Sequence, residues 1–318
     1  MMQSPANSGF TLIELSIVLV IIGLIIGGVL VGQDLVRAAE VRATISQIEK
    51  YNTAARTFYG KFGYFPGDLN GLVANQFGFT ARGNYAGEGD GNGIIEGILS
   101  TSSGSNNGNA AFTGECGMFW VDLSSAAGGH LIDGSFTAAT PTTIPSANVV
   151  GTNIGAYFPT AKLGRGNSVY VWSGGWGSGY TPNPNNNSNE GNYFGISVIT
   201  NSAFGSGYDG IPNSYADIPV AEAYAIDKKM DDGFPQSGRV TAMYVDFSVP
   251  GQTGVAWAAG SGNFGANSGL PSYGPTTTAT PASSTTCYDN ANSTAAMAYS
   301  MSVSSGANPN CALSFQFQ

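Results

Sequence analysis

The chain has 318 residues, of which only 10% are charged, and its formal net charge is −9. Five of its 11 basic residues lie between residues 34 and 61, so the remainder is strongly acidic, which argues against non-specific nucleic-acid binding. The only histidine is His130, and no Ser-His-Asp, metal-hydrolase or phosphate-loop pattern is present, so we expect no enzyme. Abundant Gly, Pro, Asn, Ser and Thr after residue 60 favour β structure with long loops.

The N-terminal region contains an uninterrupted apolar segment. No charged residue occurs from Leu15 to Gln33, which is long enough to cross a bilayer as a helix. The one early charge is Glu14, and a carboxylate in an apolar segment is costly, which usually indicates a function. No basic residue precedes Gly9 and no clear small-residue cleavage site follows the apolar segment, so a secretory signal peptide is disfavoured.

The apolar segment continues directly into an amphipathic pattern. The spacing of its apolar positions is helical; they are Leu35, Val41, Ile45, Ile48, Tyr51, Ala55 and Phe58. We therefore expect one helix from about Phe10 to about Tyr59, roughly 75 Å long. Residues 10–33 form its apolar half, which could span a membrane, and residues 34–60 form the amphipathic half.

The stretch GFTLIELSIVLVIIGLI, from Gly9 to about Ile25, resembles the class III signal of type IV pilins and type II secretion pseudopilins. The resemblance implies that residues 1–9 are a leader, that a prepilin peptidase cuts after Gly9, and that the new terminal Phe10 is N-methylated. It also implies that Glu14 pairs with the terminal amine of a neighbouring subunit. The physics agrees, because two opposite charges in an apolar core remove each other's desolvation penalty.

Two features depart from that family's usual pattern. The leader MMQSPANSG carries no Lys or Arg, and the helix has glycines where many pilins have a kinking proline. Each glycine costs about 1 kcal/mol in a helix interior, and the four are Gly23, Gly27, Gly28 and Gly32. We expect local melting or stretching there on assembly, or alternatively close helix packing through small-xxx-small pairs.

Residues 61–318 are expected to form an extracellular β-rich domain with long loops, which makes the chain an α+β protein. We expect an antiparallel sheet of at least four strands with a few short helices. The stretches 119–137 and 218–242 resemble a subgroup of large pilin-like proteins. They predict a short helix from Phe119, a helix from Pro219 to about Met230, and a strand over 239–247. The final residues ALSFQF alternate as a strand at a sheet edge or closing a sheet does.

Three cysteines are present. In an exported domain, Cys287 and Cys311 near the C-terminus are expected to form a disulfide, as in the C-terminal region of the pilins that the chain resembles. Such a bond contributes roughly 3 kcal/mol through chain entropy. The remaining Cys116 is expected to be a buried free thiol beside Phe119 and Trp120, with an intermolecular link as the alternative.

The segment GEGDGNGIIEG, residues 87–97, resembles the first half of an EF-hand calcium loop. Its candidate ligands are Glu88, Asp90, Asn92, the carbonyl of Ile94, and Glu96. Leu99 stands where the bidentate Glu is expected, so further ligands would come from elsewhere, with Glu115 and Asp122 as candidates. Calcium is therefore a possible cofactor, and an acidic turn without an ion is the alternative.

Two other groups of residues are candidate sites. Asp227, Asp231 and Asp232 could hold a second cation, although a helix end followed by an Asp-Gly turn explains them better. The Asn- and Gly-rich region within 138–217 carries aromatic residues that we expect to be exposed; a sugar or a partner could bind there, or the region could be an ordinary insertion. These aromatics are Trp172, Trp176, Tyr180 and Tyr193.

These patterns together predict a structural subunit of a type IV pilus or related filament. Its partners would be copies of itself, other pilins, a prepilin peptidase and an inner-membrane assembly platform. It would reside in the bacterial inner membrane before assembly and then in an extracellular or periplasmic filament. A minor or tip pilin that acts as an adhesin, or a type II secretion pseudopilin, remains the alternative.

Overall fold

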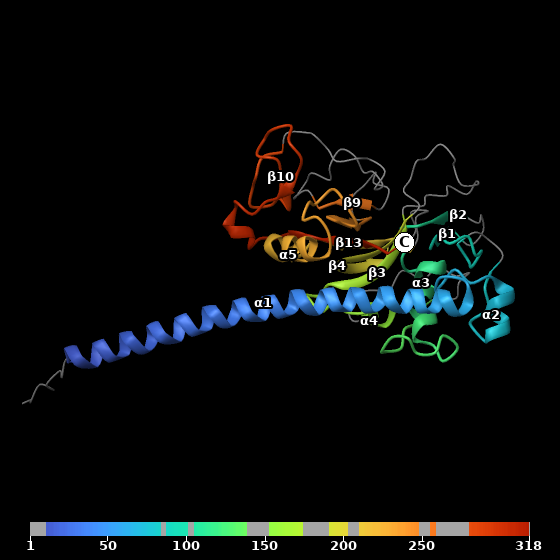
Figure 1. Ribbon diagram of the computed structural model, residues 1–318, viewed down its shortest axis with the longest axis horizontal. Helices are drawn as coiled ribbons and strands as arrows, with labels where there is room; N and C mark the ends of the chain where they lie inside the picture. The colour runs from blue at the N-terminus through green and yellow to red at the C-terminus, as the bar shows by residue number, and fades with distance from the viewer. Residues whose placement is uncertain are drawn as a thin grey trace, which may run out of the picture.

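The computed structural model describes residues 11–83, 87–100, 105–138, 153–173, 191–202, 210–247, 255–258 and 280–317. Its dominant element is helix α1 (Leu12–Phe62), 51 residues long, so the single N-terminal helix predicted from the sequence is confirmed. The first half of α1 projects from the globular domain and the second half runs along it (Figure 1). The helix ends at Gly63, whose φ of 79° is the left-handed conformation that glycine adopts readily.

The projecting half of α1 is a continuous helix in the single chain. It passes through Gly23, Gly27, Gly28 and Gly32 without a break. A side chain added at any of these four glycines would meet nothing within 4 Å. Packing within the chain therefore does not explain the glycines, and their role in assembly stays a prediction.

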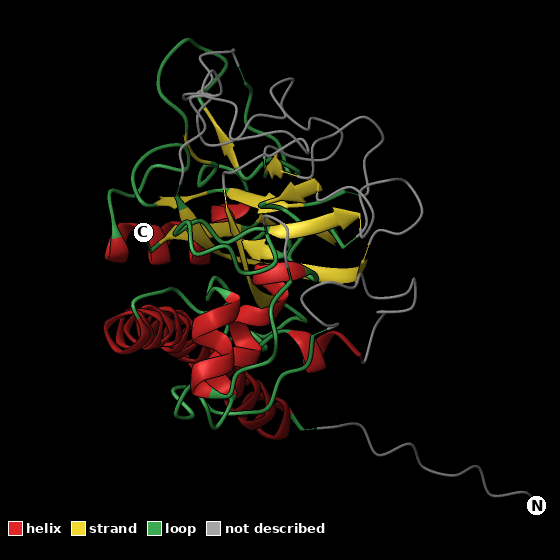
Figure 2. Ribbon diagram, turned by 90° about the vertical axis from the view of Figure 1, so that its right-hand side faces the viewer, coloured by secondary structure: helices red, strands yellow, loops and turns green. Residues whose placement is uncertain are grey.

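The second half of α1 packs against the domain through one face. Its buried residues recur every three or four positions, which places them on one side of the helix; they are Val41, Thr44, Gln47, Ile48, Tyr51, Ala54, Ala55, Phe58 and Phe62. This stripe contacts helices α3 (Gly114–Ser124) and α5 (Val220–Met230). Figure 2 shows helices gathered beside the sheet, with α1 among them.

The central sheet has five antiparallel strands and confirms the α+β fold. The order is β3 (Ser168–Ser173), β4 (Asn192–Ser202), β13 (Leu313–Gln316) and β7 (Val240–Thr241), and β5 (Pro212–Tyr215) also pairs with β4. The C-terminal strand β13 lies between β4 and β7, in the interior of the sheet and not at an edge. The last residues of the chain thus join strands that are far apart in sequence.

Smaller elements surround this sheet. The short helices are α2 (Gly71–Phe77), α4 (Ile154–Tyr157) and the 3₁₀ turn η2 (Ser304–Gly306). Four two-stranded ladders pair β1 (Gly97–Ser100) with β2 (Ser105–Asn107), β6 (Ile218–Pro219) with β12 (Pro309–Cys311), β8 (Met243–Val245) with β9 (Val255–Trp257), and β10 (Tyr288–Asp289) with β11 (Ala298–Tyr299).

The predicted local elements are found with shifted boundaries. The helix expected from Phe119 begins earlier, at Gly114, and ends at Ser124, whereas α5 agrees with the predicted helix to within one residue. The strand expected over 239–247 is divided into β7 and β8 at Ala242. That residue donates its N–H to the Pro235 carbonyl and accepts from the Ala258 N–H, so it leaves the ladder between β7 and β13.

The position of Trp172 contradicts the expectation that the aromatic residues within 138–217 are exposed. It lies in β3 with 0% of its surface exposed, its ring stacks on Tyr193 with centroids 4.7 Å apart, and its Nε1 donates to Ser314 Oγ at 3.0 Å. Tyr193 is buried as well. All six residues of β3 are buried, so both faces of the strand are covered by other parts of the protein. Trp176 and Tyr180 lie outside the described residues.

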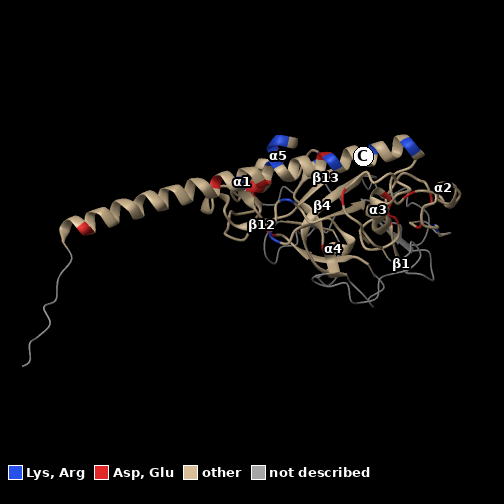
Figure 3. Ribbon diagram, turned by 90° about the horizontal axis from the view of Figure 1, so that it is seen from below, with Lys and Arg blue, Asp and Glu red and all other residues tan. Residues whose placement is uncertain are grey.

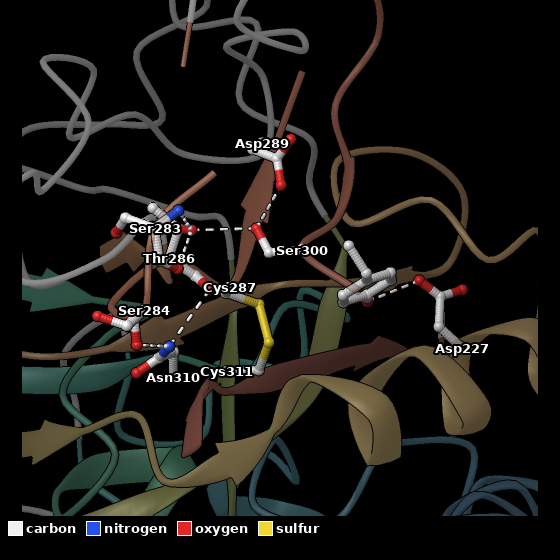
Figure 4. Close-up of a disulfide and its surroundings, with 10 residues drawn as sticks. Asp227, Ser283, Ser284, Thr286, Cys287, Asp289, Ser300, Asn310 and Cys311 are labelled. Carbon is white, nitrogen blue, oxygen red and sulfur yellow. Dashed lines mark hydrogen bonds between the residues drawn. A yellow bond between two sulfur atoms is a disulfide. The ribbon is translucent and has the colours of Figure 1, made fainter. Parts of the chain in front are cut away.

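The predicted disulfide between Cys287 and Cys311 is present (Figure 4). It joins the residue before β10 to the end of β12, across a separation of 24 positions. Beside it, Asn310 Nδ2 donates to the carbonyl oxygens of Ser284 and Thr286 at 2.9 and 3.3 Å. Cys116 is a buried free thiol, as expected.

The disulfide should stabilise the domain measurably. Replacing both cysteines, as Cys287→Ser with Cys311→Ser, is expected to lower the free energy of unfolding by about 3 kcal/mol, because the unfolded chain gains loop entropy. Urea unfolding of the full chain in detergent measures this. A reducing agent should have the same effect on the native chain and none on the double variant; equal stability of the two chains would contradict the role.

Candidate functional site

The projecting half of α1 is the first candidate site. Within the described residues, Leu12–Phe62 is the one helix long and apolar enough to cross a membrane, and none of its most apolar window is buried inside the chain. Figure 3 shows almost no blue or red on this half of the helix, apart from one red position near its start. Its large apolar side chains are exposed over residues 12–36. A surface of this kind requires a lipid or protein environment.

Glu14 is held by its own first helical turn. Its Oε2 accepts from the Thr11 backbone N–H and from the Thr11 hydroxyl, both at 2.8 Å, while the Glu14 N–H donates to Thr11 Oγ1 at 3.3 Å. This reciprocal pattern is a capping box, which satisfies two otherwise unpaired N–H groups of the helix start. Both bonds from Thr11 reach the same carboxylate oxygen, so Oε1 can accept from another donor. Gly9 and Phe10 lie outside the described residues.

Comparison with known families identifies this segment. Residues 4–30 match the family described as the prokaryotic N-terminal methylation motif. The chain thus carries a prepilin-type cleavage and methylation motif, and its long N-terminal helix followed by a globular domain is pilin-like. Over this segment the chain is similar to type IV pilins and pseudopilins, which are typically structural proteins, and the motif is consistent with membrane anchoring followed by assembly. No curated protein and no solved structure matches the chain significantly.

The second candidate site is a cluster of three carboxylates beside the end of α1. One oxygen of each of Asp68, Asp90 and Glu115 lies within 4.8 Å of the others. Asp68 follows the turn after α1, Asp90 lies in the glycine-rich loop, and Glu115 lies in the first turn of α3. Such a cluster could bind a metal ion such as calcium, which takes oxygen ligands.

Backbone N–H groups of the glycine-rich loop hold two of these carboxylates. Asp68 accepts from Gly91 at 2.8 Å and from Gly93 at 2.9 Å, one bond to each oxygen. Glu115 Oε1 accepts from Gly89 at 2.9 Å and from Asp90 at 3.2 Å, and its Oε2 accepts from Glu96 at 3.0 Å. The loop is therefore folded around the two buried carboxylates.

Burial dominates the titration of the cluster. Burial and the neighbouring Asp90 raise the pKa of Asp68 to about 7, although bonds from the loop N–H groups oppose the shift. Burial, with the repulsion of Asp68 and Asp90, raises the pKa of Glu115 well above its usual range. A bound cation would favour the charged forms that burial disfavours.

The predicted ligands are only partly brought together. Asp90 and the additional candidate Glu115 are in the cluster, while Asn92 donates to Asp90 Oδ2 at 3.0 Å and accepts from the Ile94 N–H at 2.6 Å. Glu88 and Glu96 are buried, and neither is among the clustered carboxylates. Whether any of these residues, or the carbonyl of Ile94, holds an ion stays a prediction.

Asp122, the other additional candidate, has a different partner. Its Oδ2 accepts from Arg82 Nη2 at 2.5 Å and from the Gly67 N–H at 2.7 Å, and both side chains are fully buried. Sequence analysis also missed Asp68. Pro66-Gly67 before it is typical of a turn, but nothing local in the sequence indicates that the Asp68 carboxylate lies against a loop some 20 residues away.

The second acidic group is formed by Asp227, Asp231 and Asp232. One carboxylate oxygen of each also lies within 4.8 Å of the others. Its oxygens are engaged by the turn that follows α5: Asp227 accepts from Gly233 at 3.0 Å, and Asp232 accepts from Phe234 at 2.8 Å. Asp231 accepts from the N–H groups of Arg239 and Val240. These bonds support the structural interpretation of a helix end and turn. Figure 4 shows Asp227 accepting a hydrogen bond that comes from Tyr299, at 2.8 Å.

The buried acids predict a pH dependence of stability. Burial raises the pKa of Asp227 to about 7, as it does for Asp68, whereas an unfolded Asp titrates near about 4. The folded state thus holds these protons more tightly, so the stabilisation is complete below pH 4 and is lost as the pH rises through 7. Thermal unfolding of the chelator-treated chain should show a melting temperature that falls between pH 5 and pH 8. Asp227→Asn should flatten this slope, and a melting temperature that rises with pH would contradict the assignment.

Proposed function

We propose that this protein is a structural subunit of a type IV pilus or related filament. Cleavage between Gly9 and Phe10 removes residues 1–9, and N-methylation modifies the new terminus. The helix anchors the subunit in the bacterial inner membrane until the assembly platform transfers it into the filament. There residues 10–33 form the core with copies of the chain and with other pilins, and residues 61–318 cover the outside.

The observation that carries this proposal is the unpartnered apolar half of α1 joined to the prepilin-type motif. The Leu, Ile and Val side chains over residues 12–36 are exposed, and none of them belongs to the buried core of the described residues. Each such side chain contributes about 1.5–3 kcal/mol when it is fully buried. A bundle of these helices buries the same surface that the bilayer covers before assembly, so transfer from lipid to filament keeps the apolar side chains out of water.

Glu14 gives this bundle its register. Its carboxylate retains an oxygen that accepts no bond from Thr11, so a neighbour's terminal ammonium can pair with it while the capping box persists. In an apolar core, such a pair relieves two desolvation penalties together. A helix shifted by one turn would leave both charges unpaired, which disfavours other registers.

Two narrower roles remain as alternatives. A minor or tip pilin that acts as an adhesin is favoured by the size of the domain, although the buried Trp172 no longer supports binding through that aromatic residue. A type II secretion pseudopilin is favoured by the calcium-like loop. Chelation would then reduce secretion together with the stability of the domain.

Calcium is proposed as the ion of the cluster formed by Asp68, Asp90 and Glu115. Three carboxylates that converge at the glycine-rich loop, one from the loop itself and two from neighbouring segments, suit a hard divalent cation, and the repulsion among them is relieved when it binds. The candidate ligands of the loop that lie outside the cluster, Glu88, Asn92, the Ile94 carbonyl and Glu96, belong to the same proposal with a weaker geometric basis.

Replacement of Glu14 tests the filament role. Glu14→Gln removes the charge and keeps the side-chain shape, so the chain should still enter the membrane but be strongly depleted from sheared filaments. Immunoblots of membrane and filament fractions measure the ratio. The matched control is Glu49→Gln, an exposed acid on the amphipathic half, which should assemble normally. Equal incorporation of both variants would contradict the proposed pairing.

Calcium should stabilise the domain. An excess of free calcium at about 100 times its dissociation constant is expected to raise the free energy of unfolding by about 2.7 kcal/mol. Thermal unfolding with calcium and with a chelator measures the difference. Asp90→Asn should reduce it, whereas Asp133→Asn, which changes an exposed carboxylate elsewhere, should not. The same melting temperature with calcium and with chelator would contradict calcium binding at this cluster.

A further inference from the structure

A groove with a volume of about 660 Å³ lies beside the amphipathic half of α1. Its walls come from α1, from residues 133–136 and from residues 155–162. Among the lining residues, Ala43 and Thr160 are exposed and Phe136 is half-buried, so the groove is open to solvent and part of its surface is apolar. Clefts of this size commonly take up a ligand, and this one has room for the side chains of a partner protein.

The groove carries two ammonium groups and one carboxylate. Lys50 Nζ pairs with Asp133 Oδ2 at 2.5 Å, but 94% of the Asp133 side chain is exposed, so this surface pair contributes little to stability. Lys162 also lines the groove, and it makes no ion pair among the described residues. The apolar stems of both lysines add to the apolar surface. The groove therefore suits a partner that offers an apolar side chain beside a carboxylate.

The turn that follows α5 offers this combination. Phe234 is 48% exposed, and its N–H donates to Asp232 Oδ1 at 2.8 Å. The Gly233 N–H donates to the buried Asp227, and a β-carbon added to Gly233 would lie 3.4 Å from Lys228 Cβ, so the turn is folded back onto the end of α5. Asp232 is exposed and makes no ion pair with any other residue that the structure describes. A phenyl ring that is held in water in this way gains free energy when a partner buries it.

The groove and this turn lie on opposite sides of α1. Lys50 lines the groove, whereas Asn52 shares a small cleft with Lys229, in the last turn of α5. Lys50 and Asn52 are two positions apart, which is about 200° round a helix of 3.6 residues per turn. In Figure 1, α5 is on the upper side of α1, and α4, which contributes Gly155 to the groove, is on the lower side. Complementary surfaces on opposite sides of one subunit make a heterologous contact, which generates a helical filament when the rotation does not close a ring.

We propose that the Phe234 turn of one copy of this chain inserts into the groove of the next copy in the filament. The ring is buried against the apolar wall that includes Phe136, and Asp232 pairs with Lys162. The basic end of α5 then faces Asp133 at the mouth of the groove. A second copy is the occupant because each copy carries both surfaces, with opposite charges beside them. The inference rests on the proposed filament role and adds a contact between domains to the apolar core.

Cross-linking in sheared filaments tests this contact. Ser237 is exposed and its N–H donates to the Phe234 carbonyl, so Ser237→Cys marks the turn, and Ser135→Cys marks the groove. A chain with both substitutions, treated with a short thiol cross-linker, should give a ladder of multimers, because each copy joins two neighbours. The matched control is Ser293→Cys with Ser135→Cys, since Ser293 is also exposed but lies between β10 and β11.

The outcomes separate this inference from the filament role. Filaments that contain the doubly substituted chain but show no more multimers than the control overturn the contact and leave the filament role intact. Absence of the native chain from filaments contradicts both. A ladder that forms only with Ser237→Cys and Ser135→Cys together supports the contact.

Charge exchange tests the same contact without cysteines. Lys162→Glu should lower the ratio of filament to membrane chain about fivefold, and Asp232→Lys in the same chain should restore it, because the pair is remade with opposite polarity. Loss without rescue would mean that another partner occupies the groove, which overturns the assignment to a second copy. Unchanged assembly of Lys162→Glu would overturn it as well.

Replacement of the ring keeps the test decisive if melting temperatures show that a charge variant does not fold. Phe234→Ala should lower the same ratio about fivefold, because a half-exposed ring is no longer buried on assembly. Tyr215→Ala is the matched control, since Tyr215 is similarly exposed, at 49%, but lies on β5. Equal incorporation of these two variants would contradict the insertion of Phe234.

Discussion

The structure depends on one helix that has two unlike halves. Residues of the second half bury a stripe that includes Tyr51, Ala55 and Phe58 against the domain, while the first half exposes apolar side chains all round. The buried stripe makes the helix part of the core, so the domain is carried rigidly on its own anchor. Any force or displacement applied to the apolar half is therefore passed directly to the domain. This continuity is what a subunit needs if the same helix first sits in a membrane and then in a filament.

The end of α1 organises the acidic region in a comparable way. Gly63 ends the helix, and the turn that follows directs Asp68 to the glycine-rich loop, whose N–H groups bind it. On the other side of the loop, Glu115 in α3 accepts three further N–H groups. A loop of small residues with little apolar surface thus obtains its conformation from two carboxylates. The same arrangement brings three carboxylates together, which is why the ligand proposed for this region is a cation.

The sequence predicted the features that local chemistry determines. The helical spacing between residues 35 and 58 predicted α1, the apolar pattern predicted α5, and the cysteine pair predicted the disulfide. It failed where distant residues compete for one partner. Arg82 binds Asp122, 40 positions away, and so occupies a carboxylate that the sequence offered as a candidate calcium ligand from outside the loop. Trp172 was misassigned because Gly- and Asn-rich sequence follows it; the preceding SVYVW is a short apolar run of the kind that forms buried strands.

The central claim is that α1 begins at a processed terminus and assembles through it. Mass spectrometry of filaments sheared from the native cells tests this most directly. The account predicts a chain whose first residue is an N-methylated Phe10, and its abundance relative to other pilins would separate a main subunit from a minor or tip pilin. An uncut chain that remains in the membrane would contradict the account and leave an ordinary anchored surface domain.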